Sequence, residues 1–372
     1  MIHALATTDP ITPEWLTEAL RAAGELPTGA VSTVEARAND AFNSAAAHLT
    51  LTYSNDAPAD APRQLFLKRN LATEWAVEAG RDEALFYQAM AAHRDRLPML
   101  IPCYVALIDE ARSASTLLMP DVSATHASPL GRDDQISETA LAVPDAPALD
   151  QAIDALAGFH AAWWQRPELG QGSAAPFALY PLYGDAAQFA AHVERRRGEW
   201  EQFIATEGAW FPADLRAIYE SALTRLPLLW EEGLGERMTT RRGLTLTHGD
   251  CYLSQFLCPR SRVVAPTYLV DFQGSYANLV GEDLVHMFAF WWTREQRREG
   301  DREMRSLRRY HDGLLAGNVR DYSWNDLLAE YRRGLTLMLF FPIWDETNGS
   351  AQSYWLPKLH NIVAAYQDHC LP

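Results

Sequence analysis

Two short stretches carry the most specific pattern in the chain: LTHGDCYLSQ at residues 246–255 and YLVDFQ at residues 268–273. Each contains an aspartate, Asp250 or Asp271, that ends or follows an apolar, strand-like run. We expect the two carboxylates to project from neighbouring strand ends into one cleft. Phosphoryl transfer needs one carboxylate near the accepting hydroxyl and a second that holds the metal bridging the phosphates. The pattern favours that chemistry over the alternative that both acids only cap turns.

The sequence before this pattern reads as a small β-sheet. Residues 47–53 (AHLTLTY) and 64–68 (QLFLK) alternate apolar and polar side chains, and turn-forming residues join them, which predicts an antiparallel hairpin. A long helical stretch follows at residues 73–93. Residues 115–119 (STLLM) then predict another strand, which Pro120 closes.

Helices are predicted on both sides of this β-rich region. Before it, Thr12 suits an N-cap and Pro13 suits the first helical position. After it the sequence becomes mainly helical, beginning with residues 150–164. One strand-like island interrupts the helical part, at residues 244–272.

The whole pattern predicts an α+β fold with two lobes. Residues 1–120 would form a small β-rich lobe, and residues 121–372 a larger, mainly helical lobe with a short embedded hairpin. Folds of this kind place a ligand cleft between the lobes.

Composition disfavours several classes of protein. Hydrophobic residues make up 48% of the 372 residues and charged residues 22%, which is the balance of a globular protein rather than a disordered chain. A net charge of −16 disfavours nucleic acid as a partner, because binding its backbone needs a cationic surface. The longest apolar stretches, such as residues 287–292, are too short to cross a bilayer, and no signal peptide is recognisable. We therefore expect a cytoplasmic protein with no membrane partner.

Four motifs carry a resemblance to a known family: HGDCYLSQ at 248–255, VDFQ at 270–273, GEDLVHM at 281–287 and LAGFHA at 156–161. With them the chain resembles the aminoglycoside phosphotransferase and choline kinase superfamily, and it is most similar to the ecdysteroid-kinase-like branch. The resemblance implies a protein-kinase-like fold, with a small antiparallel β-sheet lobe for the nucleotide and a larger helical lobe for catalysis and substrate. It also implies ATP and Mg²⁺ as cofactors and a small-molecule alcohol as substrate.

The resemblance assigns roles around the first motif. Asp250 is the residue that orients or deprotonates the substrate hydroxyl, and Asp271 binds magnesium. Gln255 takes the second metal-ligand position, where the family usually has Asn, so one metal ion or two remain open. His248 is expected to buttress the catalytic loop rather than to transfer a proton. Asp283 is expected to brace that loop from the following helix.

On the nucleotide side, Lys68 ends an alternating strand, as does the phosphate-pairing lysine of this fold. The resemblance implies that its ammonium contacts the α- and β-phosphates while a helix carboxylate holds it in place. That carboxylate is predicted to be Glu83, in a stretch similar to the family's Glu-x-x-Phe-Tyr helix, with Glu78 as the alternative. Taken alone, Lys68 would suit a surface strand lysine better.

The phosphate loop and the adenine-binding hinge have weaker motifs. Residues 39–44 take the position of the phosphate loop, where Asn43 tolerates a tight turn and Ser44 or backbone amides could meet phosphate oxygens. A plain hairpin turn is the alternative. The segment LLMPD takes the position of the hinge, which assigns Met119 and Asp121 to the nucleotide site.

The sequence gives fewer indications of the residues that bind the substrate. Aromatic clusters at 163–164, 291–292 and 340–344 could stack on a substrate, but paired tryptophans at helical spacing are more typical of a core, which is the interpretation we prefer. Asp345 and Glu346 could bind a cation or a sugar hydroxyl, although a solvated loop is the preferred interpretation.

These patterns predict an ATP-dependent phosphotransferase that moves the γ-phosphate to the hydroxyl of a small molecule. A protein substrate is disfavoured, because Gln273 follows Phe272 where protein kinases have the glycine of Asp-Phe-Gly. The alternative is a non-catalytic nucleotide-binding module of the pseudokinase kind, with Gln255 as its main support. Redox and metallo-hydrolase functions have little support, since the sequence has neither a GxGxxG after a strand nor an HExxH. The oligomeric state is not predicted.

Overall fold

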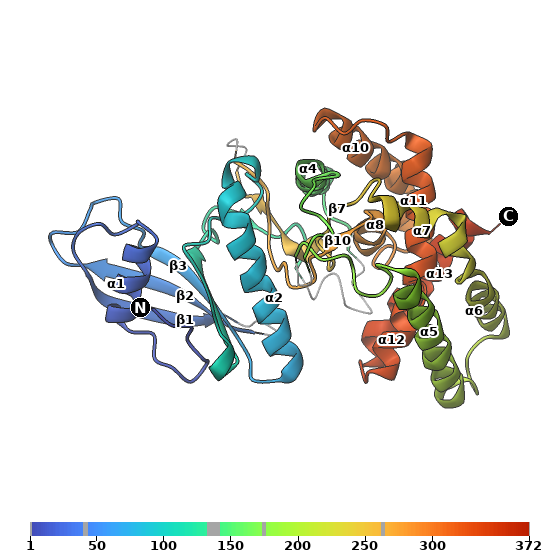
Figure 1. The fold of residues 1–372 in the computed structure, drawn as a ribbon, viewed down its shortest axis with the longest axis horizontal. Helices are drawn as coiled ribbons and strands as arrows, with labels where there is room; N and C mark the ends of the chain where they lie inside the picture. Colours follow the sequence, from blue (N-terminus) through green and yellow to red (C-terminus); the bar gives the residue numbers. More distant parts are fainter. Residues whose placement is uncertain (1, 40–43, 132–141, 173–175, 262–264, 372) are drawn as a thin grey trace. The chain divides into compact units, whose positions relative to one another are not determined.

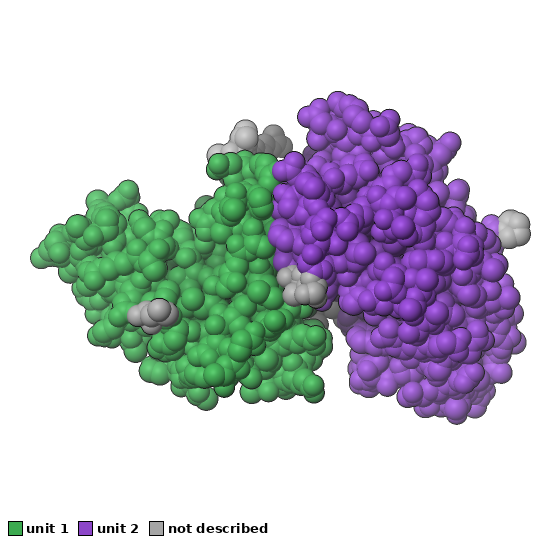
Figure 2. All heavy atoms as spheres, in the orientation of Figure 1, with its two compact units in different colours: residues 1–127, 259–275 green, residues 128–258, 276–372 purple. Residues whose placement is uncertain are grey.

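The computed structural model forms two compact units, coloured separately in Figure 2. Unit 1 comprises Met1–Ala127 and Pro259–Ser275, and unit 2 comprises Ser128–Cys258 and Tyr276–Pro372. The structure describes residues 2–39, 44–131, 142–172, 176–261 and 265–371.

These units differ from the predicted lobes, 1–120 and 121–372, in one respect that matters for the site. The segment Pro259–Ser275, which contains Asp271, packs with the N-terminal unit. Asp271 therefore belongs to the same compact body as Lys68. The division of the chain by role, into a nucleotide-binding and a catalytic lobe, stays a prediction.

Unit 1 is built on a five-stranded antiparallel sheet with the strand order β1-β2-β3-β5-β4 (Figure 1). Its strands are β1 (Val31–Asn39), β2 (Ser44–Tyr53), β3 (Gln64–Asn70), β4 (Val105–Asp109) and β5 (Ala114–Pro120). The predicted hairpin is confirmed, with Ala47 opposite Leu67. β1 is not among the predicted strands: Val34, Ala36 and Ala38 alternate with polar residues, but alanine is a weak indicator of a strand.

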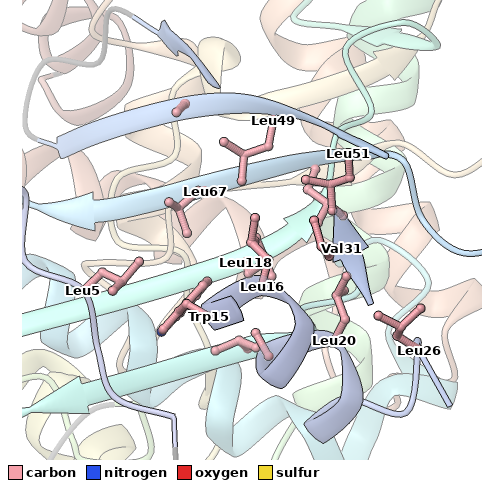
Figure 3. Close-up of a cluster of buried hydrophobic side chains, with 14 of the residues drawn as sticks. Leu5, Trp15, Leu16, Leu20, Leu26, Val31, Leu49, Leu51, Leu67 and Leu118 are labelled. Carbon is pink, nitrogen blue, oxygen red and sulfur yellow. The ribbon is translucent and has the colours of Figure 1, made fainter. Parts of the chain in front are cut away.

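Helix α1 (Pro13–Ala22) packs on this sheet and closes the core of unit 1 (Figure 3). Thr12 caps the helix as predicted, since its side chain accepts a hydrogen bond from the backbone N–H of Trp15 at 3.2 Å. Leu16 and Leu20 pack among strand leucines, and fully burying one such side chain stabilises a fold by about 1.5–3 kcal/mol. The strand leucines of this core are Leu49, Leu51, Leu65, Leu67 and Leu118.

Helix α2 (Glu74–Met90) lies against strands β3, β4 and β5. Gly80 permits this close approach: a Cβ built there would lie 2.5 Å from Oγ of Ser115 and 2.7 Å from Cβ of Asn70. The sequence predicts a helix as far as residue 93, whereas the α-helix ends at Met90 and the chain tightens into a 3-10 turn. The 3-10 turns of unit 1 are η1 (Ala91–Arg96) and η2 (Glu110–Arg112).

Unit 2 is mainly helical (Figure 1). Its α-helices are α4 (Ala146–Trp163), α5 (Ala186–Glu207), α6 (Ala213–Arg225), α7 (Gly235–Thr240), α8 (Gly281–Phe288), α9 (Arg294–Arg298), α10 (Arg302–Ala316), α11 (Trp324–Met338), α12 (Phe341–Thr347) and α13 (Gln352–Cys370). Its other described elements are β7 (Thr245–Leu246), β8 (Phe256–Pro259, in unit 2 as far as Cys258), β10 (Ala277–Asn278), η3 (Trp230–Leu234), η4 (Leu253–Gln255) and η5 (Glu299–Asp301). The two remaining short strands, β6 (His126–Ala127) and β9 (Tyr268–Leu269), belong to unit 1.

Helix α8 is placed by close packing on α11. Gly281 and Gly334 face each other, and a Cβ on Gly334 would lie 2.6 Å from the carbonyl carbon of Gly281. The predicted helix over 150–164 is confirmed as α4. None of the helices in the described part of the chain has both the length and the apolar character that a membrane span needs.

Candidate active site

An ion-paired triad in unit 1 brings together three of the predicted residues. The Nζ atom of Lys68, in β3, lies 2.6 Å from Oε2 of Glu83 and 2.5 Å from Oδ1 of Asp271. Glu83 is buried, while Lys68 and Asp271 keep 20% and 25% of their side chains exposed. Glu83, rather than Glu78, takes the position beside the ammonium. The triad thus holds one cation between two carboxylates and leaves part of it open to solvent.

Local packing fixes the members of the triad. Lys68 lies within the sheet, where β3 pairs with β2 and β5. Asp271 follows β9, and the next residue, Phe272, stacks on Phe86 of α2 with ring centroids 3.9 Å apart and planes 6° apart. This stack ties the segment of Asp271 to the helix that carries Glu83.

Asp271 has an uncommon backbone conformation. Its φ of 70° lies in the left-handed region, which residues with a Cβ rarely adopt. Strain of this kind costs on the order of 1–3 kcal/mol and gathers at functional sites, where surrounding contacts maintain it. Here the contact with Lys68 and the stacked ring of Phe272 flank the strained residue.

Burial and charge act in opposite directions on the pKa values of the triad. Burial by itself lowers the pKa of Lys68, but the carboxylates of Asp271 and Glu83 outweigh it, so this pKa lies above its ordinary value. Burial raises the pKa of Glu83, and Lys68 opposes that shift. Lys68 therefore stays an ammonium ion across the physiological range and offers its N–H groups to anionic oxygen atoms.

A second cluster, in unit 2, shapes the loop of His248 and Asp250. Asp283 of α8 accepts hydrogen bonds from the backbone N–H groups of His248 at 2.7 Å and Gly249 at 2.8 Å. Its Oδ2 atom also lies 3.0 Å from Nε2 of His160. Gly249 has a φ of 82°, a conformation that glycine adopts without a steric penalty. The Asp283 carboxylate thereby clamps the tight turn that presents Asp250, and the predicted bracing role is confirmed.

The Asp283 carboxylate is buried, charged and held in a defined orientation. Burial by itself raises the pKa of Asp283, but His160 and His248 outweigh it, so this pKa lies below its usual range. Nδ1 of His160 lies 2.6 Å from the hydroxyl of Tyr310, which orients the imidazole. The sequence predicts no role for His160 or Tyr310. The signal that could have found His160 is its place in the LAGFHA motif.

The loop residues are linked by short-range hydrogen bonds. His248 is buried, and its Nδ1 accepts a hydrogen bond from the backbone N–H of Asp250 at 3.3 Å, which fits a buttress rather than a proton carrier. The N–H of Tyr252 donates to the carbonyl of Asp250, and the N–H of Gln255 donates to the carbonyl of Tyr252, both at 2.9 Å. Asp250 and Gln255 are half-buried.

The predicted metal ligands fit a hard divalent cation in kind. Asp271 offers carboxylate oxygens and Gln255 an amide oxygen, the ligand types that Mg²⁺ and Ca²⁺ accept. Asp271 belongs to unit 1 and Gln255 to unit 2. Within the described residues, no three side chains of His, Cys, Asp or Glu gather as a metal-binding group.

The remaining predicted nucleotide residues belong to unit 1. Met119 is buried in β5. Asp121 follows that strand; one of its oxygens accepts a hydrogen bond from the backbone two residues on at 2.9 Å, and the other lies 2.6 Å from Nδ1 of His48. Ser44 begins β2 and is buried, whereas Asn43 lies outside the described residues. Contact of these residues with a nucleotide stays a prediction.

One expectation for the substrate side is wrong. Asp345 and Glu346 do not lie in a solvated loop but in helix α12. Asp345 is buried, and its Oδ2 atom lies 2.6 Å from Nζ of Lys358, because α12 packs against α13. The preferred interpretation as core is confirmed for Trp163, Trp291 and Trp292, which are buried, whereas Trp164 is half-buried and Trp344 is exposed.

Comparison with protein families gives one match. The model of a family described as the phosphotransferase enzyme family (APH) matches residues 56–330, which covers most of the chain. The match includes the triad and the loop of Asp250. A search of curated proteins gave no match. The ecdysteroid-kinase-like branch is not distinguished by this finding.

Solved structures with the same architecture share little sequence with the chain. A choline kinase from Cryptosporidium parvum Iowa II is 9% identical, with a TM-score of 0.54 over 91% of this chain and 89% of that one. A microcompartment-associated aminopropanol kinase is 14% identical, with a TM-score of 0.51 over 94% and 95%. Likeness at this level of identity establishes the fold. The predicted protein-kinase-like α+β fold, with a small antiparallel sheet lobe and a helical lobe, is confirmed.

Proposed function

Because the chain belongs to the phosphotransferase enzyme family, we propose that it moves the γ-phosphate of ATP to the hydroxyl of a small molecule. The observation that carries this proposal is the triad of Lys68, Glu83 and Asp271, which places a permanent cation beside a carboxylate suited to a metal. Phosphoryl transfer depends mainly on positioning and on charge stabilisation, and this triad offers groups for both.

On the nucleotide side, the Lys68 ammonium would donate to the α- and β-phosphate oxygens while Glu83 keeps it in place. Asp271 and Gln255 would hold Mg²⁺, which when bound neutralises charge on the phosphates. The partial exposure of Lys68 and Asp271 supports this proposal, because a ligand must reach both side chains.

On the acceptor side, Asp250 would orient the substrate hydroxyl and accept its proton. The new bond forms between the hydroxyl oxygen and the γ-phosphorus, the bond between that phosphorus and the β–γ bridging oxygen breaks, and ADP leaves. The clamp of Asp283 on the preceding backbone supports this assignment, since a catalytic carboxylate needs a fixed position.

The acceptor class can be narrowed by chemistry. The net charge of −16 is compatible with a cationic or neutral alcohol. The similar structures are named as kinases of choline and aminopropanol, so we propose small alcohols that carry an amine as the first acceptors to try. A sterol-like alcohol tests the ecdysteroid-kinase-like branch. The cytoplasmic location rests on the sequence alone and stays a prediction.

The test is a phosphorylation screen against a panel of alcohols, with mass spectrometry to detect the added phosphoryl group. The panel contains choline, ethanolamine, aminopropanol, glucosamine and a sterol alcohol, each with ATP and Mg²⁺. We expect at least one product with the wild-type protein and none with Asp250→Asn, which keeps the shape of the side chain but accepts no proton. Equal turnover by the variant would remove Asp250 from the mechanism.

A non-catalytic nucleotide-binding role is the second candidate, favoured by Gln255 in place of the family's usual Asn. It predicts that ATP binds without transfer to any alcohol. Titration calorimetry with ATP, with and without Mg²⁺, measures binding separately from the screen. Replacement of Gln255 by Asn should then create or raise transfer activity if the longer side chain is what weakens the metal site.

A further inference from the structure

The chain uses lysine only twice: of its 32 lysine and arginine residues, only Lys68 and Lys358 are lysines. Lys68 belongs to the triad described above. Lys358 lies in α13 with 0% of its side chain exposed, and the proposed reaction does not use it. Every other residue among those 32 is arginine, and at a buried site a compact ammonium is not interchangeable with a planar guanidinium.

The Lys358 ammonium lies in a cage of aromatic rings that one carboxylate closes. Asp345 provides the carboxylate, with Oδ2 at 2.6 Å from Nζ. Four ring centroids surround Nζ, at 4.1 Å for Tyr354, 4.9 Å for Phe341, 5.4 Å for Phe290 and 5.4 Å for Trp291. Aromatic faces at such distances bind ammonium ions through the negative charge of the ring face. The cage therefore has the features of a cation-binding site, and the cation that fills it is the ammonium group of Lys358.

The same cage contacts the loop of Asp250. Tyr252, two residues farther along, packs edge-on against Trp291 with ring centroids 5.5 Å apart. It also packs edge-on against His286 at 5.0 Å, and His286 contacts two further rings of the cage. The backbone N–H of Tyr252 in turn donates to the carbonyl of Asp250. Tyr252 and His286 therefore form a wall that contacts the cage on one side and supports the loop of Asp250 on the other.

Tyr252 and His286 are neutral, and the charges that act on them are those of Lys358 and Asp345 in the cage and of Asp250 and Asp283 at the loop. Burial lowers the pKa of His286 to about 3; the Asp283 carboxylate opposes this shift, and Lys358 adds to it. Burial raises the pKa of Tyr252 well above its ordinary value. The cage therefore depends on Lys358 for its positive charge and on Asp345 for its negative charge.

We propose that Lys358 is a positioning residue for the loop of Asp250, acting as a built-in ammonium ion that keeps the cage closed and Tyr252 in place. The inference rests on the role proposed above for Asp250. Without the ammonium, the rings enclose an unfilled cation site and the wall behind Tyr252 loosens. A small alkylammonium ion should then occupy the cage and restore the loop, whereas an uncharged molecule of the same length should not.

The test removes the Lys358 side chain and then adds a free ammonium ion that can take its place. Lys358→Ala deletes the side chain beyond Cβ, a fragment that n-propylammonium replaces, and propan-1-ol serves as its neutral counterpart. Hydrogen exchange at the amides of Tyr252 and Gln255, followed by mass spectrometry, measures the order of the loop without any need for turnover. We expect exchange there to accelerate about tenfold or more in the variant. n-Propylammonium should reverse the acceleration, and propan-1-ol should not.

The matched control is Arg297→Ala. Arg297 is equally buried in unit 2, but it pairs with Glu303 and Asp368 instead of the cage. This control should lower stability and leave exchange in the loop unchanged, with or without the amine. If Lys358→Ala does not fold, the double variant Lys358→Met with Asp345→Asn removes both charges at similar volume. It should show the same faster exchange, without rescue by the amine.

Activity provides an independent measurement. With an acceptor from the panel above, Lys358→Ala should lose kcat with little change in KM for ATP, and n-propylammonium should restore kcat. Loop exchange equal to that of the wild type, or equal rescue by propan-1-ol, would overturn the positioning role. A loop that responds as expected in a protein that transfers no phosphate would support that role and contradict the proposed function instead.

Discussion

The two lysines of the chain occupy contrasting environments, one in each unit. Lys68 lies between two carboxylates and keeps 20% of its side chain exposed, whereas Lys358 has one carboxylate, four aromatic rings and 0% exposure. In the proposed function, an ammonium at the edge of solvent exchanges a carboxylate for a phosphate of the nucleotide. A sealed ammonium has no such exchange available. The difference fits the roles proposed above, in which Lys68 binds phosphate oxygens and Lys358 positions the loop of Asp250.

The largest expected effect is on stability, from Lys358→Met. The substitution leaves Asp345 buried without its partner, which should lower the free energy of unfolding by about 3–5 kcal/mol. Urea denaturation of the variant and the wild type measures this change. Adding Asp345→Asn should recover much of the loss. A loss below about 1 kcal/mol would mean that the pair behaves like an exposed salt bridge and would weaken the comparison.

The next effect is on turnover, from Lys68→Met. Losing a donor to the phosphates should reduce kcat by about 10²–10³-fold, the range found when one charge-stabilising donor is deleted from an active site. Steady-state kinetics with ATP and an accepted alcohol measure the change. Lys358→Met should lower kcat as well, through the loop of Asp250, but its largest effect should be on the free energy of unfolding. A Lys68 variant with normal kcat would show that the triad serves the fold alone.

Acid should weaken the protein through His286 and His192, both in unit 2. Their pKa values are lowered from 6.5 to about 3 by burial. Between about pH 3 and pH 6.5, these histidines bind protons in the unfolded chain but not in the folded chain. Stability therefore falls as the pH falls below 6.5. Each histidine should account for about 2 kcal/mol between pH 7 and pH 5. His286→Leu should flatten the dependence by that amount in urea midpoints, and an unchanged slope would contradict the assignment.

The smallest effect concerns the approach of α2 to the sheet. Gly80→Ala places a Cβ 2.5 Å from Oγ of Ser115, so the helix that carries Glu83 must shift. Overpacking outweighs the better helix propensity of alanine, for a net loss of about 1 kcal/mol. Gly198→Ala in α5 is the matched control, because its Cβ would meet nothing within 4 Å, and it should stabilise slightly. Thermal unfolding compares the two, and equal shifts would argue against close packing at Gly80.

Elements with a local pattern could be predicted from the sequence. Thr12 and Pro13 specify the start of α1 by their own chemistry, and the alternation in β2 and β3 specifies a hairpin whatever lies beyond it. The bracing role of Asp283 could also be predicted, because this residue has a fixed place in the GEDLVHM motif. β1 is not predicted although Val34, Ala36 and Ala38 alternate with polar residues, because alanine is a weak indicator of a strand and pairing with β2 decides the outcome.

Contacts made by distant helices could not be predicted in this way. His160 and Asp283 are 123 residues apart, and only the packing of the helical unit brings them together. Asp345 stands beside Glu346, Thr347 and Asn348, and so its local sequence is that of a polar loop. Its burial follows from the packing of α12 against α13, which the sequence pattern near Asp345 does not record.

The scarcity of lysine has a practical consequence for chemical labelling. Reagents that acylate lysine leave arginine untouched, and Lys358 presents no surface to them, so Lys68 is the side-chain amine open to attack. An acyl-phosphate derivative of ATP would deliver its reactive carbonyl to that single position. One modified peptide would then report whether the proposed nucleotide site is free or already filled.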